Sequence, residues 1–182
     1  MPKSQTIRAM LFDGRTRLFA GRVREVAALV QSQPRKVSQL IECLWDEDPG
    51  VANRAADALK RASFHRPSLL APWKASLLGL LAGATENKLR WNLALIVPRL
   101  PLTVAECRRA AETLRPRFED RSSIVKTAAM QAFADLALVD ASLLSEVLDL
   151  LRIHSRSGTP AMRARGRILL QRLEKLREKE AR

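Results

Sequence analysis

The sequence has few of the residues on which most catalytic and metal sites depend. Its 182 residues include two histidines, two cysteines, no tyrosine and seven glycines. His65 and His154 have no nucleophile or ligand partner at a recognisable spacing, and no zinc-protease, serine-hydrolase or phosphate-loop motif occurs. We therefore expect a protein that is not an enzyme, needs no cofactor or metal and takes no small-molecule substrate. Both histidines are predicted to be surface residues.

Cysteine pairs and long apolar runs are also missing. Cys43 and Cys107 lie far apart without a CxxC pattern, which predicts ordinary thiols in a reducing compartment. The first twenty residues contain no apolar core of signal-peptide length. In the most apolar stretch, the longest uncharged part, Ala75 to Thr85, is about half of what a bilayer requires. These absences predict a cytoplasmic protein with no membrane span.

Helix-forming residues and positive charge are abundant. Aromatic residues make up 4% of the chain and apolar residues 47%, with alanine and leucine dominant. This composition favours helices over sheet and allows a sizeable core. Lysine and arginine number 32 against 19 acidic residues, a formal net charge of +13. The charge favours acidic partners.

One helical pattern recurs along the chain. Apolar or small residues at offsets 0, 4 and 7 from an anchor, with an apolar residue at offset 8 in the last four copies, form a single helical stripe. From the second copy onward the repeat is about 37 residues. The anchors are Val23, Val51, Leu89, Val125 and Met162. The pattern predicts helices over 16–31, 50–62, 88–99, 121–138 and 161–178.

Another helix is expected before each copy from the second onward; we call it the first helix of a pair and the recurring copy the second helix. These first helices are predicted over 34–45, 68–81, 103–115 and 140–153. The capping residues are Asp48 and Thr159, each followed by proline, Thr103 with Glu106 as a capping box, and Asp140. Each helix pair is too thin to bury its own stripe, so neighbouring pairs must stack into a solenoid.

The sequence resembles the HEAT-repeat family from about Arg17 to Leu173. The resemblance rests on DEDPGV before a second helix and on a basic residue after the anchor, as in Val23–Arg24 and Leu89–Arg90. The period is shorter than the usual HEAT spacing, and Ala52 stands where a basic residue is expected. The resemblance implies an all-α fold, a right-handed α-solenoid (α-α superhelix) of about four to five HEAT-like helix pairs.

This fold sets the expected domain organisation. Residues 16–178 would form a single HEAT-like repeat domain, residues 1–15 a disordered N-terminus and residues 179–182 a basic tail. The resemblance also implies that first helices line the convex side and second helices the concave side, where partners usually bind. Nearly all of the +13 charge belongs to the second helices.

Two explanations of these basic residues remain open. The resemblance implies that Arg90, Lys126 and Arg163 pair with turn acids such as Asp48, Glu86 and Asp120 in a ladder between repeats. The other second-helix cations have no obvious local partner, so they form either a binding surface or a solvated one. These second-helix cations without an obvious local partner are Arg54, Lys60, Arg61, Lys88, Arg165 and Arg167.

The centre of the expected groove is apolar. Residues opposite the buried stripe include Trp91, Leu95, Met130 and Ile168. Trp91 is either a core residue or an exposed anchor for a partner. Trp45 and Trp73 are expected in the core.

These features predict a non-enzymatic scaffold or binding module whose basic concave face captures an acidic, partly apolar protein segment. The alternative is binding of the duplex DNA or RNA backbone by the same groove. A remote third hypothesis is a HEAT-like DNA glycosylase using Trp91 with Asp57 or Asp135, although its active-site pattern is not matched. The C-terminal basic amphipathic helix could instead be the binding element. The predicted partner-binding residues are Arg54, Lys60, Lys88, Arg90, Trp91, Leu95, Lys126, Met130, Arg165 and Arg167.

Overall fold

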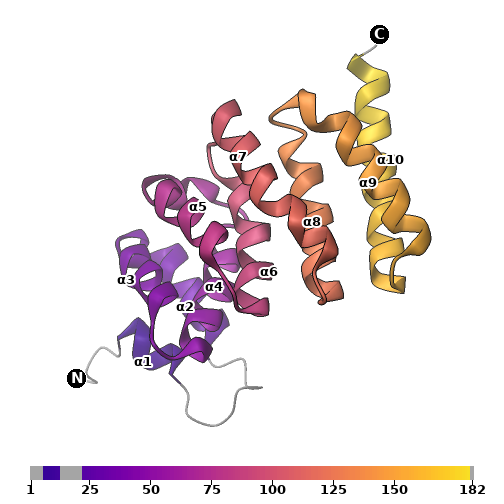
Figure 1. Cartoon of the computed structure of the whole chain (residues 1–182). Helices are drawn as coiled ribbons and strands as arrows, with labels where there is room; N and C mark the ends of the chain where they lie inside the picture. The colour runs from indigo at the N-terminus through magenta and orange to yellow at the C-terminus, as the bar shows by residue number, and fades with distance from the viewer. Residues whose placement is uncertain (1–5, 13–21, 181–182) are drawn as a thin grey trace. The chain divides into compact units, whose positions relative to one another are not determined.

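The computed structural model is helical throughout the residues it describes, 6–12 and 22–180, and these contain no strand (Figure 1). Within them, no helix is both long and apolar enough to cross a bilayer. The chain divides into two compact units, Met1–Ile96 and Val97–Arg182. The fold class is therefore all-α, as predicted.

The first unit contains six α-helices and three 3-10 helices among its described residues. Its second helices are α2, α4 and α6, which match three of the predicted copies of the recurring pattern. In chain order the elements are α1 (Ile7–Leu11), α2 (Val23–Ser32), η1 (Pro34–Lys36), α3 (Val37–Glu42), η2 (Cys43–Trp45), α4 (Pro49–Ala62), η3 (Pro67–Trp73), α5 (Lys74–Gly83) and α6 (Asn87–Ile96).

The second unit holds the remaining two copies, α8 and α10. Each follows a first helix, as the sequence predicts. The elements are η4 (Val97–Arg99), α7 (Val104–Leu114), η5 (Arg115–Glu119), α8 (Ser123–Leu136), η6 (Ala141–Leu143), α9 (Leu144–Ser157) and α10 (Pro160–Glu180).

The predicted helix caps are present. Asp48 accepts a hydrogen bond from the Gly50 N–H at 2.6 Å, directly before Pro49. Thr103 and Glu106 form the reciprocal capping box of α7. Asp140 pairs with Arg108 and accepts hydrogen bonds from the hydroxyl and the N–H of Ser142. These bonds, in that order of size, lower the pKa of its carboxyl to about 2. Local chemistry therefore fixes where these helices begin.

Second helices pack side by side within each unit. α4 contacts α2 on one side and α6 on the other, and α8 contacts α10. Each also packs on its own first helix, α3 on α4, α5 on α6, α7 on α8 and α9 on α10. All five predicted anchors are buried, with exposed fractions of 8% or less. The stripe predicted from the sequence is thus the packed face.

The N-terminal prediction is wrong for residues 6–12. Helix α1 is ordered because Ile7 and Leu11, one turn apart, bury their side chains completely or nearly so, at 1% and 0% exposed. Arg8 pairs with Asp46 at 2.6 Å and the Arg54 Nε–H donates to the Leu11 carbonyl at 2.5 Å. Residues 1–5 and 13–21 lie outside the described residues. At the other end, α10 continues through Glu180, two residues into the predicted tail.

Trp45 is not in the core as predicted, because 52% of it is exposed. The helix tightens to 3-10 geometry from Cys43, which changes the period from 3.6 to about 3 residues per turn. This change turns Cys43 and Leu44 inward and Trp45 outward. Trp73 is half-buried.

Gly166 lets α10 approach its neighbours closely. A Cβ atom at this position would lie 2.8 Å from Ser155 Cβ of α9 and 3.1 Å from Met130 Cε of α8. Met130 is fully buried, so its predicted place in an open groove is wrong. Helix α10 covers Met130 because residue 166 has no side chain.

We expect Gly166→Ala to lower the free energy of unfolding by about 1–3 kcal/mol, because the added methyl group overpacks the contact with Ser155. The matched control is Gly79→Ala on α5, where nothing lies within 4 Å of the new Cβ atom. The free energy of unfolding of that variant should rise by about 0.5–1 kcal/mol, because alanine has a better helix propensity than glycine. Urea unfolding followed by circular dichroism measures both. Stabilisation by both substitutions would contradict the close packing at Gly166.

Candidate functional site

The predicted partner-binding residues divide between the two units. The first unit holds Arg54, Lys60, Lys88, Arg90, Trp91 and Leu95, and the second holds Lys126, Met130, Arg165 and Arg167.

In the first unit, Lys60 is the centre of a polar cluster between α4 and α6. Its Nζ lies 2.9 Å from Asp57 Oδ1, donates to Asn92 Oδ1 at 2.6 Å and stands 4.2 Å from the centroid of the Trp91 ring. Asn92 is buried and its amide donates to the Lys88 carbonyl at 2.9 Å. The Lys60 side chain is only 15% exposed. Lys60 therefore stabilises helix packing, and its ammonium group covers one face of half-buried Trp91.

The other predicted residues of the first unit are also engaged or partly covered. Arg54 donates to the backbone of α1, and Arg90 donates to Asn87 on its own helix. Leu95 is half-buried, whereas Lys88 is exposed. The first unit thus presents fewer free cations than its sequence suggests.

Several ion pairs join different elements within the two units. Asp48 and Asp120 accept hydrogen bonds from the backbone N–H groups of Gly50 and Ser122. Arg152 pairs with Glu174 and so joins α9 to α10. Four further pairs have sequence separations of 31 to 38 residues, namely Arg8–Asp46, Arg108–Asp140, Arg115–Glu146 and Arg172–Asp135. Sequence reasoning missed them, although a sequence separation near one repeat is a signal that could have found them.

In the second unit, α10 presents a stripe of cations around an apolar residue. Arg165, Ile168, Arg172 and Lys175 are spaced by three, four and three residues, so they lie on one side of the helix. We call these four residues the α10 stripe. Ile168 is 59% exposed and the three cations are exposed. The stripe therefore presents one exposed branched apolar side chain between two arginines.

The α10 stripe borders α8 through Asp135. The Arg172 Nη1 lies 2.9 Å from Asp135 Oδ1, and the Gln131 amide donates to Asp135 Oδ2 at 2.8 Å. Arg99 of η4 lies near the same carboxylate. Burial lowers the pKa of Arg99, and the charge of Asp135 partly offsets this. Asp135 therefore pairs with Arg172 and also acts on Arg99 through its charge.

Two predicted residues of the second unit lie away from the stripe. Arg167 is exposed, but two residues from Arg165 it points roughly 200° around the helix. Lys126 is half-buried and close enough to His154 to lower the pKa of the imidazole. Of the predicted residues, only Arg165 belongs to the stripe.

His154 is buried, so its predicted surface position is wrong. Together with Val147 and Leu151 it lies on the inward stripe of α9, and its ring stacks on Phe118 with centroids 5.3 Å apart. Burial is the main cause that lowers its pKa, opposed by the charge of Glu119. His65 is exposed. Among the described residues no group of histidine, cysteine and carboxylate side chains is arranged to hold a metal.

Comparison with known proteins identifies the fold alone. No protein-family model and no curated protein matches the sequence. The solved structures that resemble it include two crystal structures of engineered proteins from the Northeast Structural Genomics Consortium, each with 14% sequence identity. The first has a TM-score of 0.62 and the match covers 93% of this chain and 78% of that one. The second has a TM-score of 0.59, over 92% of this chain and 47% of that one.

We expect Lys60→Met to lower the free energy of unfolding by about 1–3 kcal/mol, because it leaves the partly buried Asp57 carboxylate and the Asn92 amide without their shared donor. Lys88→Met, at an exposed position one turn before Asn92, is the control and should change it by less than about 0.5 kcal/mol. Chemical unfolding measures both. Equal effects would mean that the cluster does not stabilise the packing of α4 on α6.

We expect the unfolding temperature to fall between pH 7 and pH 5 because of His154. Its pKa in the folded state lies below the ordinary value of 6.5. The contribution of the neutral imidazole to the free energy of unfolding is therefore complete above pH 6.5 and is lost as the pH falls through the lowered pKa. His154→Leu should flatten this part of the profile. Thermal unfolding across the pH range, with His65→Leu as the exposed control, measures the effect. A profile that keeps its slope in His154→Leu would contradict this origin.

Proposed function

We propose that this chain is a non-enzymatic HEAT-like binding module, a right-handed α-solenoid of about four to five helix pairs, that captures an acidic, partly apolar protein segment. The observation that carries the proposal is the α10 stripe, in which Arg165 and Arg172 flank Ile168, 59% exposed. Cations with an apolar centre match the surface expected from the sequence. The proposed surface lies on the last helix, whereas the sequence predicted it around Trp91 and Met130.

The HEAT-like assignment is supported by stacking and by caps. Second helices contact one another within each unit, and each packs on its own first helix. The acidic turn with Asp48 and Pro49 caps α4 in the way the resemblance requires. Proteins built from such stacked pairs commonly bind partners along the second helices.

The spacing within the stripe suggests the form of the partner. Arg165 and Arg172 are seven residues apart, which is about 10 Å along a helix. A partner helix with carboxylates two turns apart and a leucine between them would pair with both arginines and cover Ile168. Arginine suits this task because its planar guanidinium binds carboxylate in two-point fashion. Such charges act mainly on the association rate and specificity, while the apolar contact adds affinity.

The nucleic-acid alternative fits the stripe less well. Phosphate contacts would use the arginines but would place Ile168 against a charged backbone. The exposed residues of α8 and α10 include no aromatic side chain on which a base could stack. An acidic protein segment is therefore the better match.

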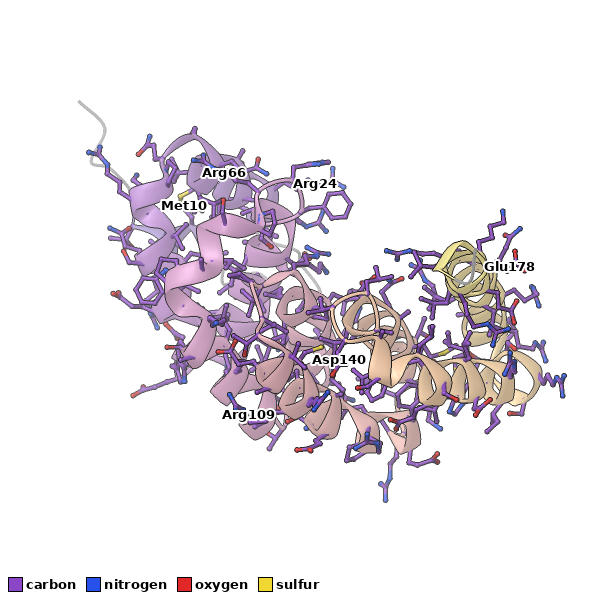
Figure 2. The ribbon with its side chains drawn as sticks, turned by 90° about the horizontal axis from the view of Figure 1, so that it is seen from above. Met10, Arg24, Arg66, Arg109, Asp140 and Glu178 are labelled. Atoms are coloured by element: carbon purple, nitrogen blue, oxygen red, sulfur yellow. The ribbon has the colours of Figure 1, made fainter. Side chains whose placement is uncertain are left out.

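We expect a fluorescein-labelled helical peptide, with two glutamates seven residues apart and a leucine between them, to bind in an anisotropy titration. Arg165→Glu with Arg172→Glu should weaken binding at least about tenfold, because both ion pairs become repulsive. The control is Arg109→Glu with Arg156→Glu, which changes net charge equally at exposed positions of α7 and α9 (Figure 2 labels Arg109).

Equal loss in the two double variants would show that attraction is generic and would overturn the proposal. A random-sequence DNA duplex provides the second comparison. Tighter binding to the duplex at near-physiological salt, with a log–log salt slope of several units, would favour the nucleic-acid alternative.

A further inference from the structure

We infer that Asp135 is an internal competitor for the acidic partner: it holds Arg172 in the free protein and is displaced from it when a partner carboxylate binds. The inference rests on the proposed function and concerns the regulation of the same surface. Its basis is the Arg172–Asp135 pair, with Nη1 and Oδ1 2.9 Å apart.

The pair already has the geometry that a partner carboxylate would adopt. Arg172 and Asp135 come from different helices, α10 and α8, and their side chains are 48% and 31% exposed. The Gln131 amide holds the second carboxylate oxygen at 2.8 Å and so orients it. The guanidinium that the partner needs is therefore occupied, yet open enough to solvent for exchange.

Asp135 would retain partners after losing Arg172. The half-buried guanidinium of Arg99 lies near enough for its pKa to respond to the Asp135 charge. The Gln131 bond lies on the same helix as Asp135 and does not involve α10. Because the Gln131 bond does not use Arg172 and Asp135 is 31% exposed, exchange leaves the carboxylate with a hydrogen-bond donor and with access to water.

The two arginines of the stripe consequently differ in availability. Within the described part of the chain Arg165 has no carboxylate at ion-pair distance, so it can receive a partner directly, whereas Arg172 must first release Asp135. A half-exposed pair of this kind should lower the affinity by about two- to fivefold. Partners with a single acidic residue would pair with Arg165 and gain little from Arg172. The internal carboxylate thus reduces the advantage that a partner with two correctly spaced acids has over a partner with one.

The test measures binding of the two-glutamate peptide to Asp135→Asn, which keeps the size of the side chain and an acceptor for Gln131. We expect binding about two- to fivefold tighter than that of the wild-type protein. Asp149→Asn is the matched control, because Asp149 pairs with Arg152 within α9. The affinity of this variant for the peptide should equal that of the wild-type protein apart from the generic effect of removing one negative charge. Two further peptides replace one glutamate each with glutamine. Because a peptide with a single acidic residue pairs with Arg165, the gain in affinity should disappear for both.

The outcomes separate the inference from the proposed function. If Arg165→Glu with Arg172→Glu abolishes binding but Asp135→Asn binds no tighter than Asp149→Asn, the inference is overturned and the function stands. If the stripe variants bind as the wild-type protein does, or the wild-type protein does not bind, the proposed function itself fails.

A measurement on the wild-type protein guards against misfolding of the variant. The carboxyl carbon of Asp135 should show a changed chemical shift when the peptide saturates the protein, because its Arg172 partner leaves. The carboxyl carbon of Asp140, which pairs with Arg108 on other helices of the same unit, should not move. An unchanged Asp135 signal at saturation would overturn the inference whatever the variant does.

Discussion

The burial of one apolar stripe per helix against the neighbouring helix is the interaction on which the rest of the structure depends. A helix such as α4, with alanines and leucines on its inward side, cannot bury that stripe alone. It does so between α2, α3 and α6. Because the inward sides are fixed by packing, the charged residues are left on the outward sides, and the chemistry of the surface follows from the core.

Part of the outward charge serves the packing itself. Arg8, Arg108 and Arg115 each reach a carboxylate about one repeat away, and Lys60 is held by Asp57 and Asn92. A net charge of +13 therefore does not mean that every cation is available to a partner. The α10 stripe combines an exposed apolar residue with three cations, one of which is already engaged with a carboxylate.

The close approach of α10 at Gly166 links the core to this surface. Removing a side chain at that point lets α10 cover Met130 and sets the rotation of the helix. The same rotation points Ile168 outward and brings Arg172 to Asp135. One glycine in the buried stripe thus influences which groups a partner could meet.

The sequence by itself determined the helix pairs, the buried anchors and the caps, because these depend on neighbours within a turn or on an apolar period along one helix. The Thr103–Glu106 box and the five anchors are examples. The tertiary structure decided which polar residues remain free. Burial of Met130 and His154, exposure of Trp45 and the partners of Lys60 and Arg172 all depend on groups roughly one repeat away or on a local change from α to 3-10 geometry. The apolar pattern of one helix does not determine how the neighbouring helix is rotated about its own axis. The candidate site could therefore be predicted as a basic surface but not residue by residue.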